Sequence, residues 1–77
     1  METAKKECVT LEARVLRVCR CELLVCDLCT ALEVIVHTPK ACCFQVGDCV
    51  RIQYGGMMTL SIPPQISADG ICRMNDC

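Results

Sequence analysis

Apolar and polar residues alternate most regularly along residues 44–67, where the sequence predicts two β-strands joined by a tight turn. Residues 49–54 and residues 57–62 each carry an apolar side chain at every second position. Gly55-Gly56 between them supplies the positive φ angles that a two-residue hairpin loop requires, so we expect the two strands to pair antiparallel. The side chains expected to point into the core are Val50, Ile52, Leu60 and Ile62.

The N-terminal half of the chain predicts three further strands, at residues 9–18, 21–27 and 32–37. Along the first of these, the apolar positions change parity between Val15 and Leu16. A parity change of one residue inside a strand is typical of a β-bulge or a sharp bend. We therefore expect the first strand to bend and to take part in two parts of the sheet.

Short polar and proline-containing segments connect these strands. Thr38-Pro39 predicts a single helical turn that reaches Cys43, with threonine as the N-cap and proline at the first helical position. Residues 46–48 predict the turn that leads into the next strand, and Pro63-Pro64 ends the last strand because proline cannot donate to a ladder. Residues 66–73 are expected to add a short extension.

Composition is consistent with one small domain that spans residues 1–77, with a core at about 9–72. Apolar residues make up 53% of the chain and tryptophan is absent, so aliphatic and sulfur-containing side chains must fill the core. The net charge is −1 and the eight Lys and Arg residues are scattered, which is not the electrostatic pattern of a polyanion-binding protein. No apolar run has the length of a membrane helix, and the N-terminus lacks the apolar region of a signal peptide. We expect a cytoplasmic protein with no membrane contact, although a chain trimmed of an export signal would look the same.

Five short antiparallel strands with a bent first strand suit a closed barrel. The chain resembles small bacterial OB-fold domains of unknown function, through F-x-V-G-D-x-V-R-I-x-Y-x-G at residues 44–56 and S-I-P-P-Q-I at residues 61–66. The resemblance implies an all-β, five-stranded OB-fold-like antiparallel barrel in which the usual helix is reduced to a turn. It implies no established chemistry.

OB-folds bind ligands across strands two and three, between the loops that join strands 1–2 and 4–5. On this arrangement, the candidate residues for binding a ligand or partner are Arg17, Arg20, Arg51, Tyr54 and Met57. Met57 has outward parity and a flexible side chain suited to an adaptable contact, and Arg20 can donate to an acidic group on the partner. Nucleic acid is the weaker alternative ligand, because the chain has only two aromatic residues and Glu22 and Glu33 lie on the expected face.

Ten cysteines are the most unusual feature of the composition. Reduced and inert thiols fit the regular apolar strands best, and a disulfide framework or a thiolate metal site remain as alternatives. The spacing Cys21-x4-Cys26-x2-Cys29 occurs in ferredoxins, but an extended strand holds Cys21 and Cys26 about 16–17 Å apart. The four cysteines that can converge on a metal, if the connector folds back, are Cys26, Cys29, Cys42 and Cys43.

No arrangement of residues points to catalysis. His37 is the only histidine and ends a predicted strand, and no serine or cysteine has an evident His/Asp partner. The sequence predicts a non-enzymatic binding module without a cofactor, whose partner is an unknown protein or peptide. A cysteine-thiolate metal-binding protein and a binder of single-stranded nucleic acid are the alternatives, and homo-oligomerisation stays open.

Overall fold

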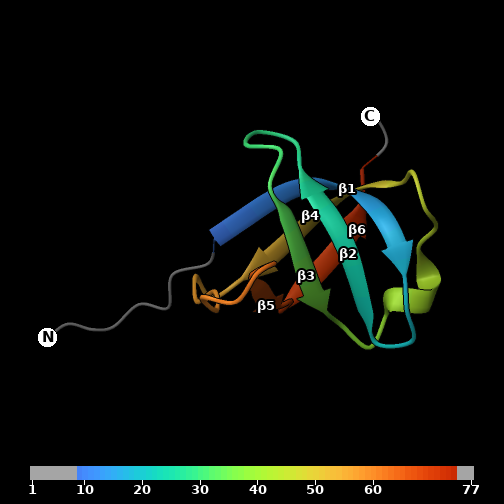
Figure 1. Ribbon diagram of the computed structural model, residues 1–77. Coiled ribbons are helices and arrows are strands. Elements are labelled where there is room, and N and C mark those ends of the chain that lie inside the picture. Colours follow the sequence, from blue (N-terminus) through green and yellow to red (C-terminus); the bar gives the residue numbers. More distant parts are fainter. Residues whose placement is uncertain (1–8, 75–77) are drawn as a thin grey trace, which may run out of the picture.

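The computed structural model describes residues 9–74, and within that range six strands form one curled half-barrel sheet (Figure 1). Across the sheet, the strands follow the order β5-β3-β2-β1-β4-β6. The elements are β1 (Val9–Val18), β2 (Glu22–Asp27), β3 (Glu33–His37), the 3-10 helix η1 (Ala41–Cys43), β4 (Cys49–Tyr54), β5 (Gln65–Ser67) and β6 (Gly70–Arg73). The prediction that the chain is predominantly β is confirmed, with six strands in place of the expected five.

The longest strand, β1, pairs with two neighbours. Its N-terminal part lies antiparallel to β4, and its C-terminal part lies antiparallel to β2. The register with β2 shifts between Val15 and Arg17, which places a bulge at Leu16. The expected bend at the parity change is confirmed, and it lets one strand belong to two parts of the sheet.

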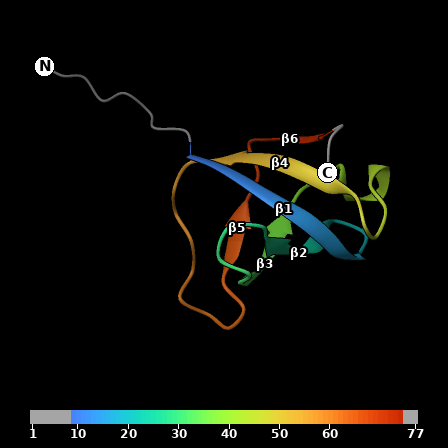
Figure 2. The same cartoon turned by 90° about the horizontal axis from the view of Figure 1, so that it is seen from above.

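The last two strands, β5 and β6, lie at the two edges of the sheet, and residues 68 and 69 connect them. β5 runs parallel to β3, and β6 runs antiparallel to β4. Between them, the Ala68 amide donates to the carbonyl of His37 at 3.0 Å, and the Asp69 amide donates to the carbonyl of Gln53 at 2.7 Å. Figure 2 shows β5 and β6 meeting at this corner. One short segment therefore contacts both β3 and β4.

The prediction of a hairpin around Gly55-Gly56 is wrong. Residues 57–62 form no strand, and β4 is followed by a loop over residues 55–64, which we call the apolar loop. A two-residue turn of the expected type needs positive φ at both glycines, and only Gly56 has it, at 92°. In addition, both edges of β4 are already occupied, because Ile52 pairs with Leu11 of β1 and with Ile71 of β6. No position beside β4 is left for another strand.

The core lies inside the curl of the sheet. Val50 and Ile52 are fully buried, as predicted, whereas Leu60 and Ile62 are each 98% exposed, so the inward assignment of these two residues is wrong. The buried apolar cluster is Leu11, Ala13, Val15, Leu23, Val25, Val34, Val36, Ala41, Phe44, Val50, Ile52, Tyr54 and Ile66. Aliphatic side chains supply most of its volume, as the lack of tryptophan required.

The connector between β3 and β4 contains only one helical turn. It begins later than expected, because Lys40 and not Thr38 is the N-cap of η1. Thr38 is buried, and its Oγ1 accepts a hydrogen bond from the Lys40 amide at 3.1 Å. The threonine thus stabilises the turn that precedes the helix.

Candidate functional site

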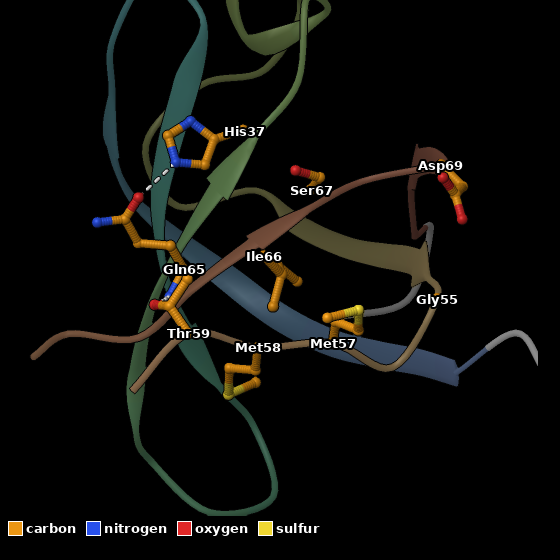
Figure 3. A pocket seen from close by; sticks show the side chains of 9 residues that line it. All are labelled: His37, Gly55, Met57, Met58, Thr59, Gln65, Ile66, Ser67 and Asp69. Carbon is orange, nitrogen blue, oxygen red and sulfur yellow. Dashed lines mark hydrogen bonds between the residues drawn. The ribbon is translucent and has the colours of Figure 1, made fainter. Parts of the chain in front are cut away.

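A cleft of about 500 Å³ lies between the start of the apolar loop and strands β3 and β5 (Figure 3). Its lining residues are His37, Gly55, Met57, Met58, Thr59, Gln65, Ile66, Ser67 and Asp69. Figure 3 shows Ser67 and Asp69 along one side of the cleft and Met57 and Met58 along the other. The cleft therefore has one polar wall and one apolar wall.

Hydrogen bonds at Thr59 hold the base of the apolar loop. The Thr59 amide donates to the carbonyl of Gln65 at 3.0 Å, and the Gln65 amide donates to Thr59 Oγ1 at 2.9 Å. Ser61 Oγ lies 2.7 Å from Thr59 Oγ1 and donates to the Pro63 carbonyl at 3.0 Å. A hydroxyl has one proton to donate, so the threonine hydroxyl is the donor to Ser61. The loop also joins the sheet, since the Ile35 amide donates to the Pro64 carbonyl at 2.9 Å.

The apolar loop presents its apolar side chains to solvent. Leu60 and Ile62 are each 98% exposed, and Met57 is 84% exposed. Single exposed apolar residues are common on protein surfaces, but three of them within six consecutive residues form a local apolar surface. Because hydrogen bonds close the loop at its base, this surface has a defined shape.

His37 lies at one end of the cleft and contacts two polar neighbours. Its Nε2 lies 2.7 Å from Oε1 of Gln65 (dashed line in Figure 3), and its Nδ1 lies 3.6 Å from a carboxylate oxygen of Glu22. The amide oxygen can only accept, so Nε2 carries the proton in this contact. The ring therefore links β2, β3 and β5 at the surface.

The structure does not bring the five predicted binding residues together. Met57 lines the cleft, whereas Tyr54 is 7% exposed and belongs to the core. Arg51 lies on the outer side of β4, where its guanidinium forms an ion pair with Glu12 at 3.1 Å. Arg51 alternates with the buried Val50 and Ile52, so its side chain points away from the core, and it does not line the cleft.

The other two predicted arginines lie nearer the start of β2. Arg17 lines a separate depression of about 280 Å³ on the outer face of β1, β2 and β3, beside Leu24 and Ile35. Arg20 is exposed in the turn between β1 and β2, and its carbonyl accepts a weak hydrogen bond from the Cys42 thiol at 3.6 Å. Neither arginine lines the cleft.

The four cysteines predicted to converge on a metal are also apart. Cys26 and Cys29 lie at the C-terminal end of β2 and in the turn that follows, whereas Cys42 lies in η1 beside Arg20, at the other end of β2. The connector thus packs against the turn between β1 and β2 and does not fold back towards Cys29. Within residues 9–74, no three His, Cys, Asp or Glu side chains lie close enough together to hold a metal ion.

Most of the thiols in the described part of the chain are free. The free cysteines among residues 9–74 are Cys19, Cys21, Cys26, Cys29, Cys42, Cys43 and Cys72. Cys49 differs from these, since it is buried and disulfide-bonded. Cys8 and Cys77 lie outside the described residues.

The polar wall of the cleft and the exposed end of the apolar loop were not predicted from the sequence. Ser67 and Asp69 carry no recognisable motif. The parallel pairing of β5 with β3 places Ser67 beside His37, and a backbone hydrogen bond to Gln53 of β4 holds Asp69 at the other end of the cleft. A signal for the loop was present in the sequence, because Gly55-Gly56 and Pro63-Pro64 bracket it and both dipeptides are typical of turns and loops.

Comparisons with protein-family models, curated proteins and solved structures found no match to this chain. Within residues 9–74, no helix has the length and apolar character needed to cross a membrane. The fold and the site together define a small half-barrel protein with an amphipathic cleft beside an exposed apolar loop.

Proposed function

We propose that this chain is a small OB-like barrel that acts as a protein-interaction module, and that it docks on its partner through the apolar loop and the adjacent cleft. The observation that carries this proposal is the exposure of Leu60 and Ile62, each 98%, on a loop closed by hydrogen bonds at Thr59. A preformed apolar surface loses less conformational entropy on binding than a disordered one, so a smaller part of the free energy released by its burial is offset by the cost of ordering.

The strand pairing supports the OB-like assignment. β1 pairs with both β2 and β4 across a bulge, and the last segment of the chain contacts β3 and β4. In an OB-fold, the loop between strands four and five borders the ligand-binding surface. The apolar loop follows β4 and leads into β5, so it occupies the corresponding place.

A protein partner fits this surface better than a nucleic acid does. Base stacking requires exposed aromatic side chains, and both aromatic residues, Phe44 and Tyr54, are buried. Phosphate binding requires cations, and among residues 9–74 neither lysine nor arginine lines the cleft.

Panning of a displayed random-peptide library against the immobilised protein tests the proposal. The wild type is expected to enrich apolar sequences, and the double variant Leu60→Ser/Ile62→Ser is expected to lose them. Burial of each side chain contributes about 1.5–3 kcal/mol, which corresponds to about tenfold or more in affinity per residue.

The matched control is Leu28→Ser/Leu32→Ser. These two leucines are 50% and 59% exposed in the turn between β2 and β3, away from the cleft. This control is expected to enrich the same peptides as the wild type. The proposal is overturned if the wild type enriches no peptide, or if the loop variant retains the peptides that the wild type selects.

A further inference from the structure

The cleft beside the apolar loop carries a carboxylate that has no partner among residues 9–74. Asp69 stands at its polar wall, between β5 and β6. Its amide donates to the carbonyl of Gln53 at 2.7 Å, which fixes the backbone there. Within residues 9–74, its carboxylate forms no hydrogen bond and no ion pair. The carboxylate is therefore available to a ligand.

Neighbouring charged groups leave this carboxylate unneutralised. Lys40 lines a depression on the other side of Asp69 without an ion pair to it in the described part of the chain. His37, at the opposite end of the cleft, faces the carboxylate of Glu22 at 3.6 Å and the amide oxygen of Gln65. The groups next to the imidazole are thus a carboxylate and an amide oxygen, and neither of them neutralises the carboxylate of Asp69.

The opposite wall of the cleft is apolar. Met57 and Met58 come from the apolar loop, and Ile66, which is 2% exposed, lies between the two walls (Figure 3). Methionine side chains adapt to the shape of an aliphatic ligand. A ligand that satisfies both walls has an apolar stem and a cationic end, which is the chemistry of lysine and arginine side chains.

We propose that the cleft receives a lysine or arginine side chain from the partner protein. The methylene stem lies along Met57 and Met58, and the cationic end binds the carboxylate of Asp69, with the hydroxyl oxygen of Ser67 as a second acceptor. This inference rests on the proposed function, and it specifies a basic residue beside the apolar residues that the loop contacts. Charge complementarity then selects the sequence of the partner, while the apolar contact supplies most of the affinity.

Panning the same peptide library against the Asp69→Asn variant tests the inference. The wild type is expected to enrich peptides that carry Lys or Arg next to apolar residues, and Asp69→Asn is expected to enrich apolar peptides without that preference. Glu33→Gln is the matched control, because it removes one exposed carboxylate from β3 outside the cleft. It is expected to keep the basic preference.

Fluorescence anisotropy with one enriched peptide sharpens the result. Asp69→Asn is expected to weaken binding about fivefold, as for a single ion pair at a partly exposed site. A peptide with norleucine in place of the basic residue is expected to bind wild type and Asp69→Asn equally. The affinity of the basic peptide for the wild type is expected to fall as salt screens the charges.

The possible outcomes separate the two proposals. Apolar peptides without a basic preference, or equal binding of the basic peptide by wild type and Asp69→Asn, overturn the inference and leave the interaction module standing. Enrichment of no peptide by the wild type overturns both. A thermal melt of Asp69→Asn that matches the wild type shows that any weakening reflects the lost charge.

Discussion

The two connections that flank β4 differ in what holds them and in what they expose. The turn before β4, at residues 45–48, is tied to two other strands. The apolar loop after β4 forms most of its hydrogen bonds within itself and with the neighbouring β5 and β3, and it turns its largest side chains to solvent. The contrast separates residues that stabilise the fold from residues that are free to bind.

The turn before β4 is fixed from both sides. The Asp48 amide donates to the carbonyl of Gln45 at 3.0 Å, and Gly47 has a φ of 95°, as the third position of a type II turn requires. Val15, beside the bulge of β1, exchanges two backbone hydrogen bonds with the turn, to Gly47 and Asp48, each 2.8 Å long. From β6, Arg73 Nε donates to the Asp48 carboxylate at 3.1 Å.

The same arginine extends this network to the connector. Its Nη2 donates to the carbonyl of Cys43 at 2.9 Å, and its guanidinium lies 5.5 Å from the centre of the Phe44 ring. Residues 43–48 are thus joined to β1 and to β6. The apolar loop has no comparable side-chain hydrogen bond to β1 or β6 within the described residues, and the exposed side chains of Leu60 and Ile62 contribute little to the packing of the fold.

Ile52 lies in β4 between the two connections, and its truncation gives the reference loss of stability with which substitutions in both connections are compared. It is fully buried, so Ile52→Ala is expected to lower the free energy of unfolding by about 2–4 kcal/mol. Urea denaturation measures this directly. A loss below about 1 kcal/mol would show that the inner face of β4 does not form the core.

Two glycines give a matched comparison of the connections. Gly47→Ala is expected to cost about 1–2 kcal/mol, because the turn needs a left-handed residue there and no crowding is involved. Gly55 does not have positive φ and has open space at its Cβ position, so Gly55→Ala is expected to leave stability unchanged or raise it by up to about 1 kcal/mol. Urea denaturation of both variants measures the two effects. Equal losses of stability at Gly47 and Gly55 would contradict the proposed difference between the two connections.

The pH dependence of stability tests the side-chain tie of the turn. The Gln45 amide, which donates to the carboxylate, holds the pKa of Asp48 below its ordinary value of 3.8, and Arg73 acts in the same direction while desolvation opposes both. The unfolded chain therefore takes up the proton more readily than the folded one. The contribution of Asp48 is fully present above pH 3.8 and is lost as the pH falls through the lowered pKa.

Asp48→Asn is expected to flatten this acid limb of the stability curve and to leave its neutral part parallel to that of the wild type. Denaturant titrations at several acidic pH values measure the difference. An acid limb of unchanged steepness in the variant would mean that the carboxylate of Asp48 has no part in holding the turn.

Substitutions in the apolar loop are expected to have the smallest effect on stability. Leu60→Ser and Ile62→Ser should each change the free energy of unfolding by less than about 0.5 kcal/mol, because both side chains are already in solvent. Ile66→Ala is the control, since that side chain is 2% exposed and its truncation is expected to cost about 2 kcal/mol or more. A loop substitution as costly as Ile66→Ala would place that side chain in the core.

Local patterns in the sequence predicted the first four strands of the fold. The parity change at Leu16 predicted the bulge of β1, and alternation predicted β4 with Val50 and Ile52 inward. Residues 57–62 alternate just as well, yet they form a loop, because β1 and β6 already occupy both edges of β4. That competition is between segments distant in the chain, and a local period does not contain it.

The candidate site was harder to predict from the sequence than the strands, because contacts between segments distant in the chain form it. Met57 was predicted as a contact residue from its outward parity, and it does line the cleft. Ser67 belongs to the site because β5 pairs with β3, and Asp69 belongs to it because its amide is hydrogen-bonded to Gln53 of β4. Arg51 was predicted to bind a ligand or partner, but the pairing of β4 with β1 places its side chain against Glu12, and it does not line the cleft.

Amide chemical-shift mapping tests most directly the claim that the apolar loop, and not the turn before β4, is the docking surface. A peptide enriched on the wild type is titrated into the ¹⁵N-labelled protein. The account predicts that the largest shifts fall within residues 55–69 and that residues 45–48 are nearly unaffected. Shifts concentrated at residues 45–48, or around Arg17 and Arg20, with the apolar loop unperturbed, would contradict it.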